Sequence, residues 1–102
     1  MPKDLYVSSL LDVYGYCLNE KQRSVISYYY DDDLSLSEIA ENEGITRQGV
    51  ADLIKRSELQ LRILEENCHY CEKFLKLKEL SSAYSKGKAE SINEIIKIID
   101  TL

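Results

Sequence analysis

The sequence predicts an all-α fold, and three observations support this prediction. The 102 residues include only one proline and four glycines, so long irregular stretches are not expected. Apolar residues recur three and four positions apart through most of the chain, which is the spacing of one helix face. Two segments also begin with residue pairs typical of helix amino ends, Asn19 with Gln22 and Ser35 with Glu38.

The first two helices are predicted from apolar spacing and capping residues. Gly15 is expected to close the first helix, and Asn19 is expected to cap the second, which runs to about Tyr30. The apolar residues that define the first helix are Leu5, Leu10, Leu11, Val13 and Tyr14, and those that define the second are Val25, Ile26 and Tyr29.

A short third helix is predicted from about Leu36 to Glu43, after the capping box of Ser35 and Glu38. Gly44 stands where a left-handed residue ends a helix, and Thr46 is suited to cap the next helix only two residues later. Two helices joined by so short a turn must cross steeply.

From Arg47 onward a long helix is predicted, because no proline or glycine interrupts the pattern. Its apolar seam follows a heptad register and needs a partner surface. The seam consists of Ile54, Ser57, Leu61, Leu64, Cys68, Cys71 and Leu75. A polar break at Ser81, Ser82, Ser85 and Gly87 precedes a last helix. That helix carries Ile92, Ile95, Ile96, Ile99 and Leu102, and we expect it to pack on the long helix within the chain or across a homodimer.

The segment "LSLSEIAENEGITRQGVADLIKR", residues 34–56, has the spacing of a helix-turn-helix. Ala40 is small where the helices cross, Gly44 lies at the turn, and Ile45 and Val50 fill the angle between the helices. An unrelated helical hairpin can mimic this pattern. We expect residues 1–64 to form a helical domain with the motif at 35–56. Residues 65–102 are expected to form a long-helix extension and a C-terminal helix, either in the same compact unit or as a dimer interface.

In helix-turn-helix geometry the helix that starts after Thr46 is the recognition helix. Arg47 can form two hydrogen bonds to guanine and Gln48 two to adenine, whereas Lys55 and Arg56 suit phosphate contacts. The predicted nucleic-acid-binding residues are Thr46, Arg47, Gln48, Asp52, Lys55 and Arg56. The alternative is a solvated face on a protein-binding module, and Asp52 favours it because phosphate repels a carboxylate.

The stretch from Leu18 to about Leu64 resembles the promoter-binding region of bacterial sigma factors. It is more similar still to the YlxM-like proteins associated with the signal recognition particle. The residues that carry this resemblance are Glu20 to Arg23, Tyr28 to Tyr30, Asp33 to Ala40, Arg47, Gln48, Val50, Asp52, Ile54, Lys55 and Arg56. The resemblance implies a sigma-like, DNA-binding or regulatory protein with a role in the targeting pathway of the signal recognition particle GTPase and its RNA. Gly49 departs from the family pattern and is expected to loosen the recognition helix.

The acidic run Asp31, Asp32 and Asp33 directly precedes the motif. Capping and solubility explain it simply, because acid favours the amino end of the following helix. The functional alternative is a face that repels DNA away from the motif or binds a basic partner, such as a ribonucleoprotein subunit. The tyrosines Tyr28 to Tyr30 are expected mainly to pack in the core.

The chain as a whole is acidic, with 13 basic and 18 acidic residues, so it is not expected to coat nucleic acid non-specifically. No apolar run is long enough to span a membrane, and three cysteines argue for reduced thiols, so a cytoplasmic protein is expected. The C-x-x-C of Cys68 and Cys71 suggests zinc or redox chemistry, but both lie on the seam, where core packing explains them. No cofactor and no enzymatic activity are expected.

Overall fold

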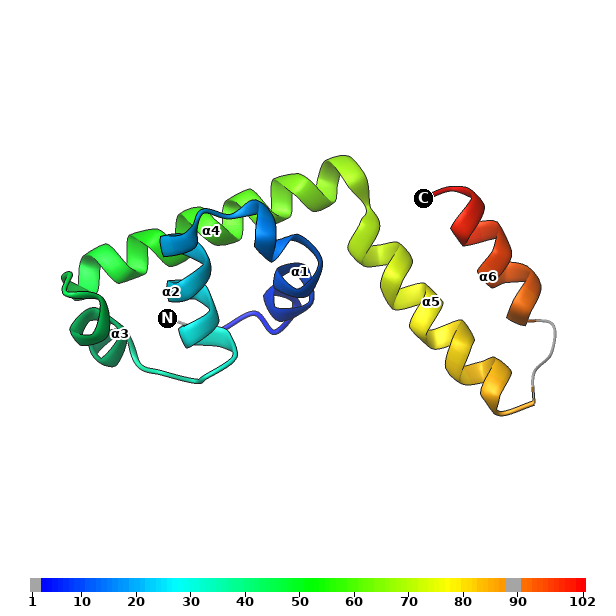
Figure 1. Ribbon diagram of the computed structural model, residues 1–102, viewed down its shortest axis with the longest axis horizontal. Coiled ribbons are helices and arrows are strands. Elements are labelled where there is room, and N and C mark those ends of the chain that lie inside the picture. Colours follow the sequence, from blue (N-terminus) through cyan, green and yellow to red (C-terminus); the bar gives the residue numbers. More distant parts are fainter. Residues whose placement is uncertain (1–2, 88–90) are drawn as a thin grey trace. The chain divides into compact units, whose positions relative to one another are not determined.

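The computed structural model describes residues 3–87 and 91–102, and within these ranges the chain is helical with no strand (Figure 1). The elements are α1 (Tyr6–Tyr14), the 3₁₀ helix η1 (Gly15–Cys17), α2 (Glu20–Tyr30), α3 (Leu36–Glu43), α4 (Arg47–Cys68), α5 (Tyr70–Ser85) and α6 (Ser91–Asp100). They form two compact units, an amino-terminal unit, Met1–Asn67, and a carboxy-terminal hairpin, Cys68–Leu102. The all-α prediction is confirmed.

Both predicted capping boxes are present. The Asn19 side chain accepts a hydrogen bond from the backbone N–H of Gln22 at 2.8 Å, and the Gln22 side chain accepts one from Asn19 at 3.2 Å. Ser35 and Glu38 form the same reciprocal pair, at 3.1 and 3.0 Å. The backbone N–H of Ser35 holds the pKa of the Glu38 carboxyl below its usual value. Each box satisfies two N–H groups that otherwise lack partners at a helix start.

α1 ends at Tyr14 with Gly15 as its C-cap residue, as predicted. The Gly15 backbone is not left-handed, however: with φ −55° and ψ −36° it is right-handed, and the chain continues as η1 until Leu18, which is extended. The position favours a small residue for a packing reason as well, because a Cβ atom there would lie 3.2 Å from Cδ1 of Leu11. Gly15 is therefore both the end of α1 and a contact point in the core.

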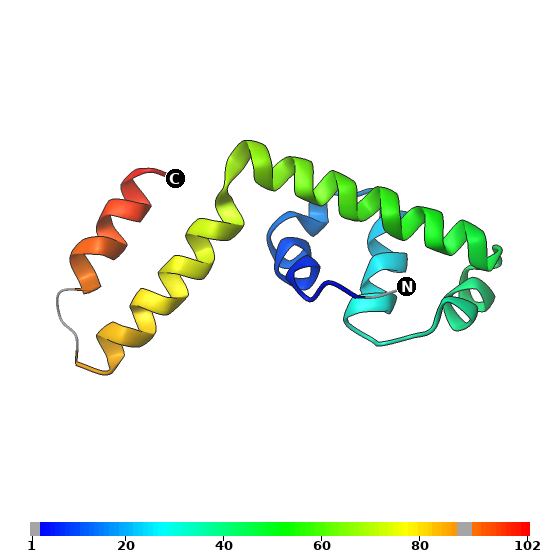
Figure 2. The same cartoon turned by 180° about the vertical axis from the view of Figure 1, so that it is seen from behind.

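In the amino-terminal unit, α4 lies along α1, α2 and α3, which are all on one side of it (Figures 1 and 2). Three tyrosine hydroxyls connect α1 and α2 to α4: Tyr6 and Tyr14 donate to Glu65 at 3.3 and 2.6 Å, and Tyr30 donates to Glu58. Burial, together with the Glu58 carboxylate, raises the pKa of Tyr30 well above its usual value. The tyrosine run thus contributes both packing and hydrogen bonds to the core.

The prediction of one unbroken long helix from Arg47 was wrong. His69 has a left-handed backbone, with φ 58° and ψ 20°, so α4 ends at Cys68 and α5 begins at Tyr70. Histidine adopts this conformation more often than most residues other than glycine, but it is a weak stop signal in a sequence. No glycine or proline marked the break.

The predicted heptad seam is therefore divided between the two units. Ile54, Ser57 and Leu61 are fully buried in the amino-terminal unit, whereas Cys71 is buried in the hairpin and Leu75 is 41% exposed. The first part of the seam therefore packs against other residues of the amino-terminal unit. Of the two C-x-x-C thiols that were predicted to pack in the core, Cys71 is buried and Cys68 is only half-buried.

In the carboxy-terminal hairpin, α6 packs against α5. Cys71, Leu80 and Ser91 are its buried residues, and Lys73 donates a hydrogen bond to the backbone oxygen of Thr101 at 2.7 Å. None of the helices in the described ranges combines the length and apolar character needed to cross a membrane. All three cysteines are free thiols, and the described residues contain no cluster of three or more potential metal ligands.

Candidate nucleic-acid interface

The turn between α3 and α4 has the conformation predicted for it. Gly44 is left-handed, with φ 67° and ψ 33°, and its N–H donates to the carbonyl of Ala40, as does the N–H of Ile45 at 3.1 Å. Thr46 then accepts a hydrogen bond on Oγ1 from the backbone N–H of Gly49 at 2.9 Å, so it caps α4. Two helices therefore meet across a three-residue turn with satisfied backbone groups at both ends.

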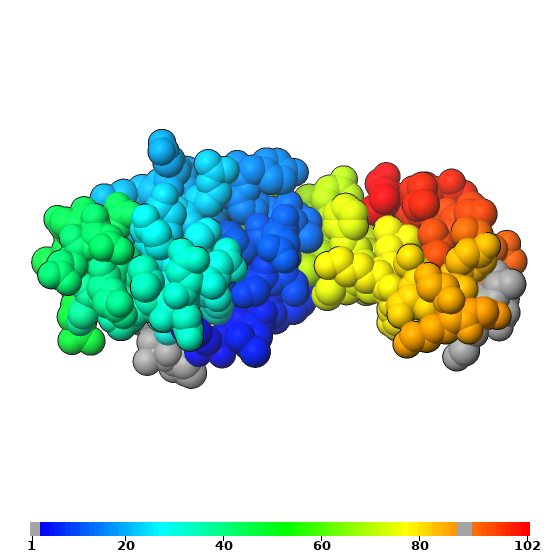
Figure 3. All heavy atoms as spheres, turned by 60° about the horizontal axis from the view of Figure 1, so that its bottom comes forward, coloured from blue at the N-terminus to red at the C-terminus, as the bar shows by residue number. Residues whose placement is uncertain are grey.

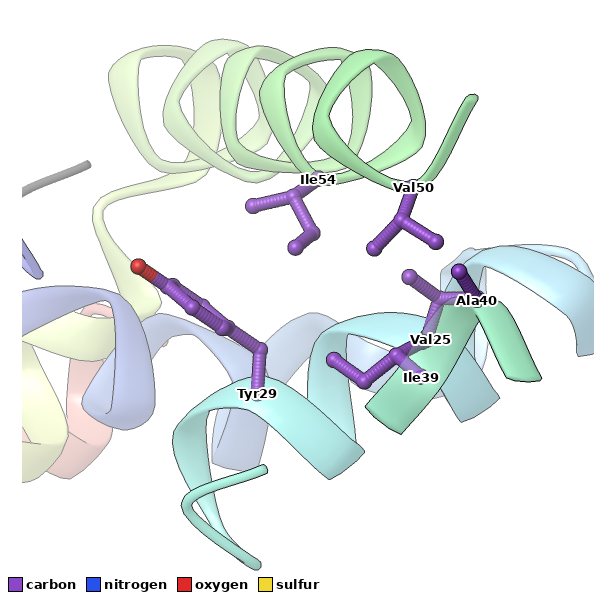
Figure 4. Close-up of a cluster of buried hydrophobic side chains, with 6 residues drawn as sticks. All are labelled: Val25, Tyr29, Ile39, Ala40, Val50 and Ile54. Atoms are coloured by element: carbon purple, nitrogen blue, oxygen red, sulfur yellow. The ribbon is translucent and has the colours of Figure 1, made fainter. Parts of the chain in front are cut away.

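A compact apolar cluster holds the two helices at this angle (Figure 4). Figure 4 shows Val50 and Ile54 pointing from α4 toward side chains of α2 and α3. The buried members are Val25, Tyr29, Ile39, Ala40, Val50 and Ile54, and Ile45 packs against them at the turn. The hydrophobic positions expected for the helix-turn-helix are thus all used as expected.

Packing on this cluster leaves the opposite face of α4 in solvent. The predicted contact residues Thr46, Arg47, Gln48, Asp52, Lys55 and Arg56 are all exposed. The green segment around the turn lies at the surface of the amino-terminal unit (Figure 3). The structure thus brings these six residues together on the amino-terminal half of one helix.

Two of the six residues are joined to each other. The side-chain amide of Gln48 donates a hydrogen bond to the carboxylate of Asp52 at 2.9 Å. Side chains four residues apart are neighbours on a helix surface, so the spacing of Gln48 and Asp52 is compatible with this contact. In the structure, Asp52 also fixes the orientation of the Gln48 amide.

The positive charges near this surface differ in their availability. Among the described residues, Arg47, Lys55 and Arg56 make no ion pair, whereas Arg62 pairs with Asp4 at 2.7 Å. The Arg62 guanidinium holds the pKa of the Asp4 carboxyl below its usual value. Arg62, further along α4, is thus used to attach the start of the chain to this helix.

The acidic run lies outside this surface and has an internal partner that the sequence did not indicate. Lys3 forms an ion pair with Asp33, and its ammonium lies 4.6 Å from the centre of the Tyr29 ring. Asp33 has a positive φ of 57°, and its contact with Lys3 lowers its pKa. Asp31 and Asp32 remain exposed. A contact between residues thirty positions apart leaves no local pattern in a sequence.

Comparison with known proteins agrees with this geometry. Residues 1–101 match the family model UPF0122, described as "Putative helix-turn-helix protein, YlxM / p13 like". The chain belongs to the UPF0122 family. A UPF0122 protein of Clostridium botulinum is 45% identical over 87 residues, covering 78% of this chain and 80% of the relative. UPF0122 protein ABC2295 of Shouchella clausii is 41% identical over 107 residues, covering 100% of this chain and 98% of the relative. The resemblance to YlxM-like proteins is therefore confirmed.

Proposed function

We propose that this UPF0122 protein is a cytoplasmic regulator that binds duplex DNA with the amino-terminal half of α4 in the major groove. The observation that carries the proposal is the exposure of Thr46, Arg47 and Gln48 at the first turn of a helix whose other face is anchored in the core. Membership in a helix-turn-helix family supports the same function.

Each exposed side chain has a distinct role in this proposal. Arg47 donates to the O6 and N7 acceptors of guanine, and its charge is not taken by an ion pair among the described residues. Gln48 donates one amide hydrogen to Asp52, which leaves its oxygen and second hydrogen for the edge of an adenine. Asp52 orients the Gln48 amide by accepting this hydrogen bond.

The phosphate contacts come from the helix end and from two cations. Thr46 accepts from the backbone of Gly49 and keeps its hydroxyl hydrogen for a phosphate oxygen. Lys55 and Arg56 lie two turns further along α4, where they can reach the DNA backbone. Two cations in contact with phosphate imply weak, salt-sensitive binding, because each such contact makes the fall of log affinity with log salt steeper by about 0.9.

Arg47→Ala and Lys55→Ala test this function when a library of duplexes is selected and affinity is measured at several salt concentrations. We expect Arg47→Ala to relax sequence preference. We expect Lys55→Ala to weaken binding to all duplexes and to reduce the salt slope by about one unit. Lys78→Ala, which removes an exposed cation of α5 in the hairpin, is the control. If the chain binds duplexes and neither Arg47→Ala nor Lys55→Ala changes that binding, the proposal is refuted.

A second candidate function is binding of signal recognition particle components through the acidic run. It is supported by the exposure of Asp31 and Asp32, for which the described residues provide no ion-pair partner. Asp33 contributes less, because Lys3 already neutralises it. On this proposal the loop attracts a basic surface of the targeting GTPase, or of a protein that carries the particle RNA.

Reversal of the two available charges, Asp31→Lys with Asp32→Lys, tests the second candidate by pull-down from native lysate with and without nuclease. We expect loss of the targeting GTPase or its RNA from the captured material. Glu41→Lys with Glu43→Lys, on α3, is a control of equal charge change. If the variant with Asp31→Lys and Asp32→Lys captures the same material as the wild-type chain, this candidate is excluded.

We further propose that the DNA-binding form is a homodimer. A single recognition helix with three unpaired cations provides few contacts, and two copies would double them. Dimers of helix-turn-helix proteins bind two half-sites in the same way.

A further inference from the structure

The apolar residues at the end of the chain are covered to different extents. Ile95 and Ile98 are half-buried, and Ile98 lines a cleft with Lys73 and Lys76. Ile92, Ile96 and Ile99 on α6, and Leu102 just beyond its end, are 40%, 51%, 53% and 50% exposed. We name these four residues the outer stripe. Three half-exposed isoleucines on a ten-residue helix, with a leucine shortly after it, are unusual for a surface that meets only water.

The hairpin is too small to be stable without further contacts. A unit shorter than about 40 residues usually needs a disulfide, a metal or an oligomeric partner. Cys68 and Cys71 are free thiols, and the described residues hold no potential metal cluster. Only Cys71, Leu80 and Ser91 are buried among the described residues of the hairpin, so its core is minimal. A second copy of the hairpin would supply further apolar contacts.

The exposed apolar area is sufficient for a dimer. Helix α5 adds four large side chains that are 41% to 49% exposed, namely Tyr70, Phe74, Leu75 and Tyr84. Burial of these side chains together with the outer stripe would remove an area on the order of the roughly 800 Å² that each partner buries in a standard interface.

The distribution of charge also favours the hairpin as the surface of contact between two copies of the chain. The hairpin carries six lysines against five acidic residues, so two hairpins meet with almost no net repulsion. The amino-terminal unit has seven basic and thirteen acidic residues, so two such units repel each other. A homodimer is therefore favoured through the hairpins and disfavoured through the helix-turn-helix units.

We infer that the outer stripe of α6 docks against the hairpin of a second copy of this chain, with α5 contributing the flanking aromatic residues. Figure 3 shows α6 at the surface of the hairpin, beside α5. The inference names the surface behind the homodimer of the proposed function and rests on that proposal for its purpose. Its test requires no DNA, so it can fail or succeed independently of DNA binding.

The test is sedimentation velocity of the full chain at micromolar concentration, with far-ultraviolet circular dichroism to check folding. We expect the wild-type chain to sediment at twice the chain mass and the double variant Ile96→Glu with Ile99→Glu to sediment at the chain mass. Leu59→Glu is the matched control, because Leu59 is 59% exposed but lies on α4 in the other unit. It should remain dimeric.

Three results would overturn the inference: a monomeric wild-type chain, a double variant that stays dimeric, or dissociation by Leu59→Glu alone. If the double variant loses helix content, Leu102→Glu decides, since Leu102 lies beyond the end of α6 at Asp100 and its replacement leaves the helix intact. Dissociation of that variant supports the interface, and a persistent dimer excludes it. Arg47→Ala should sediment as wild type whether or not DNA binding is found.

Discussion

The side-chain amide of Gln48 and the carboxylate of Asp52 are joined by a hydrogen bond of 2.9 Å on the exposed face of α4. The acidic residue that weakens the case for DNA binding is therefore also the one that holds the amide in a fixed direction. Its two effects, repulsion of phosphate and positioning of Gln48, can be separated by substitution.

Asp52→Asn should raise affinity for duplex DNA and keep the sequence preference, because the amide oxygen still accepts from Gln48 while the charge is lost. The gain should reach about fivefold at low salt, equivalent to about 1 kcal/mol. Asp52→Ala should give a similar gain but relax the preference at the base that Gln48 contacts. Fluorescence anisotropy on matched and mismatched duplexes measures both, and weaker binding by Asp52→Asn would contradict the assignment.

Gly44→Ala should lower the free energy of unfolding by about 1–2 kcal/mol, because an L-residue is strained in the left-handed region. The cost is purely conformational, since a Cβ atom at Gly44 would meet nothing within 4 Å. Gly49→Ala is the matched comparison, and it should stabilise the protein by up to about 1 kcal/mol through helix propensity. A Cβ at Gly49 would lie 3.2 Å from the exposed Thr46 hydroxyl, which can move slightly. Urea unfolding measures both changes, and equal effects would contradict the different roles of the two glycines.

Ser57→Ala should stabilise the protein by about 1 kcal/mol. The Ser57 hydroxyl is fully buried, with no hydrogen-bond partner among the described residues, so the folded state loses its hydration without compensation. Ser37→Ala, at an exposed position of α3, measures the contribution of helix propensity alone. If thermal unfolding instead shows that Ser57→Ala destabilises the protein, the Ser57 hydroxyl has a hydrogen-bond partner in the folded state.

The ion pair of Asp4 and Arg62 should contribute stability that depends on acid pH. The pKa of Asp4 is lowered from its usual value of 3.8 in the folded state, first by the Arg62 hydrogen bond and then by the N–H of Tyr6. The contribution is therefore complete at pH values above 3.8 and is lost as the pH falls through the lower folded-state pKa. The difference in unfolding free energy between wild type and Asp4→Asn should shrink below pH 3.8. Asp12→Asn is the control, and a difference that grows in acid would refute this assignment.

The features that could be predicted from the sequence are those encoded by neighbouring residues. The capping boxes, the left-handed Gly44 and the cap at Thr46 each depend on residues within four positions, and all are present. The six exposed residues of the candidate interface follow from the same local periodicity. Local patterns thus determine which face of α4 is in solvent.

The features that could not be predicted depend on residues far apart or on conformations without a strong signal. The pairs Lys3 with Asp33 and Tyr30 with Glu58 join segments about thirty positions apart. The left-handed His69 interrupts a heptad pattern that continues across it. Gly15 ends α1 as predicted, but its right-handed backbone and its close packing against Leu11 could not be predicted. In each case tertiary contacts, rather than propensity, set the outcome.

The most direct test of the central claim, that the amino-terminal half of α4 is the DNA-binding surface, is a nuclear magnetic resonance titration of the ¹⁵N-labelled chain. A mixed-sequence duplex at low salt is the probe, because non-specific binding already engages the phosphate contacts. We expect the largest amide shift changes at residues 46–48 and 52–56, with little change at 31–33. Changes confined to the acidic run, or none at a saturating concentration of duplex, would contradict the central claim.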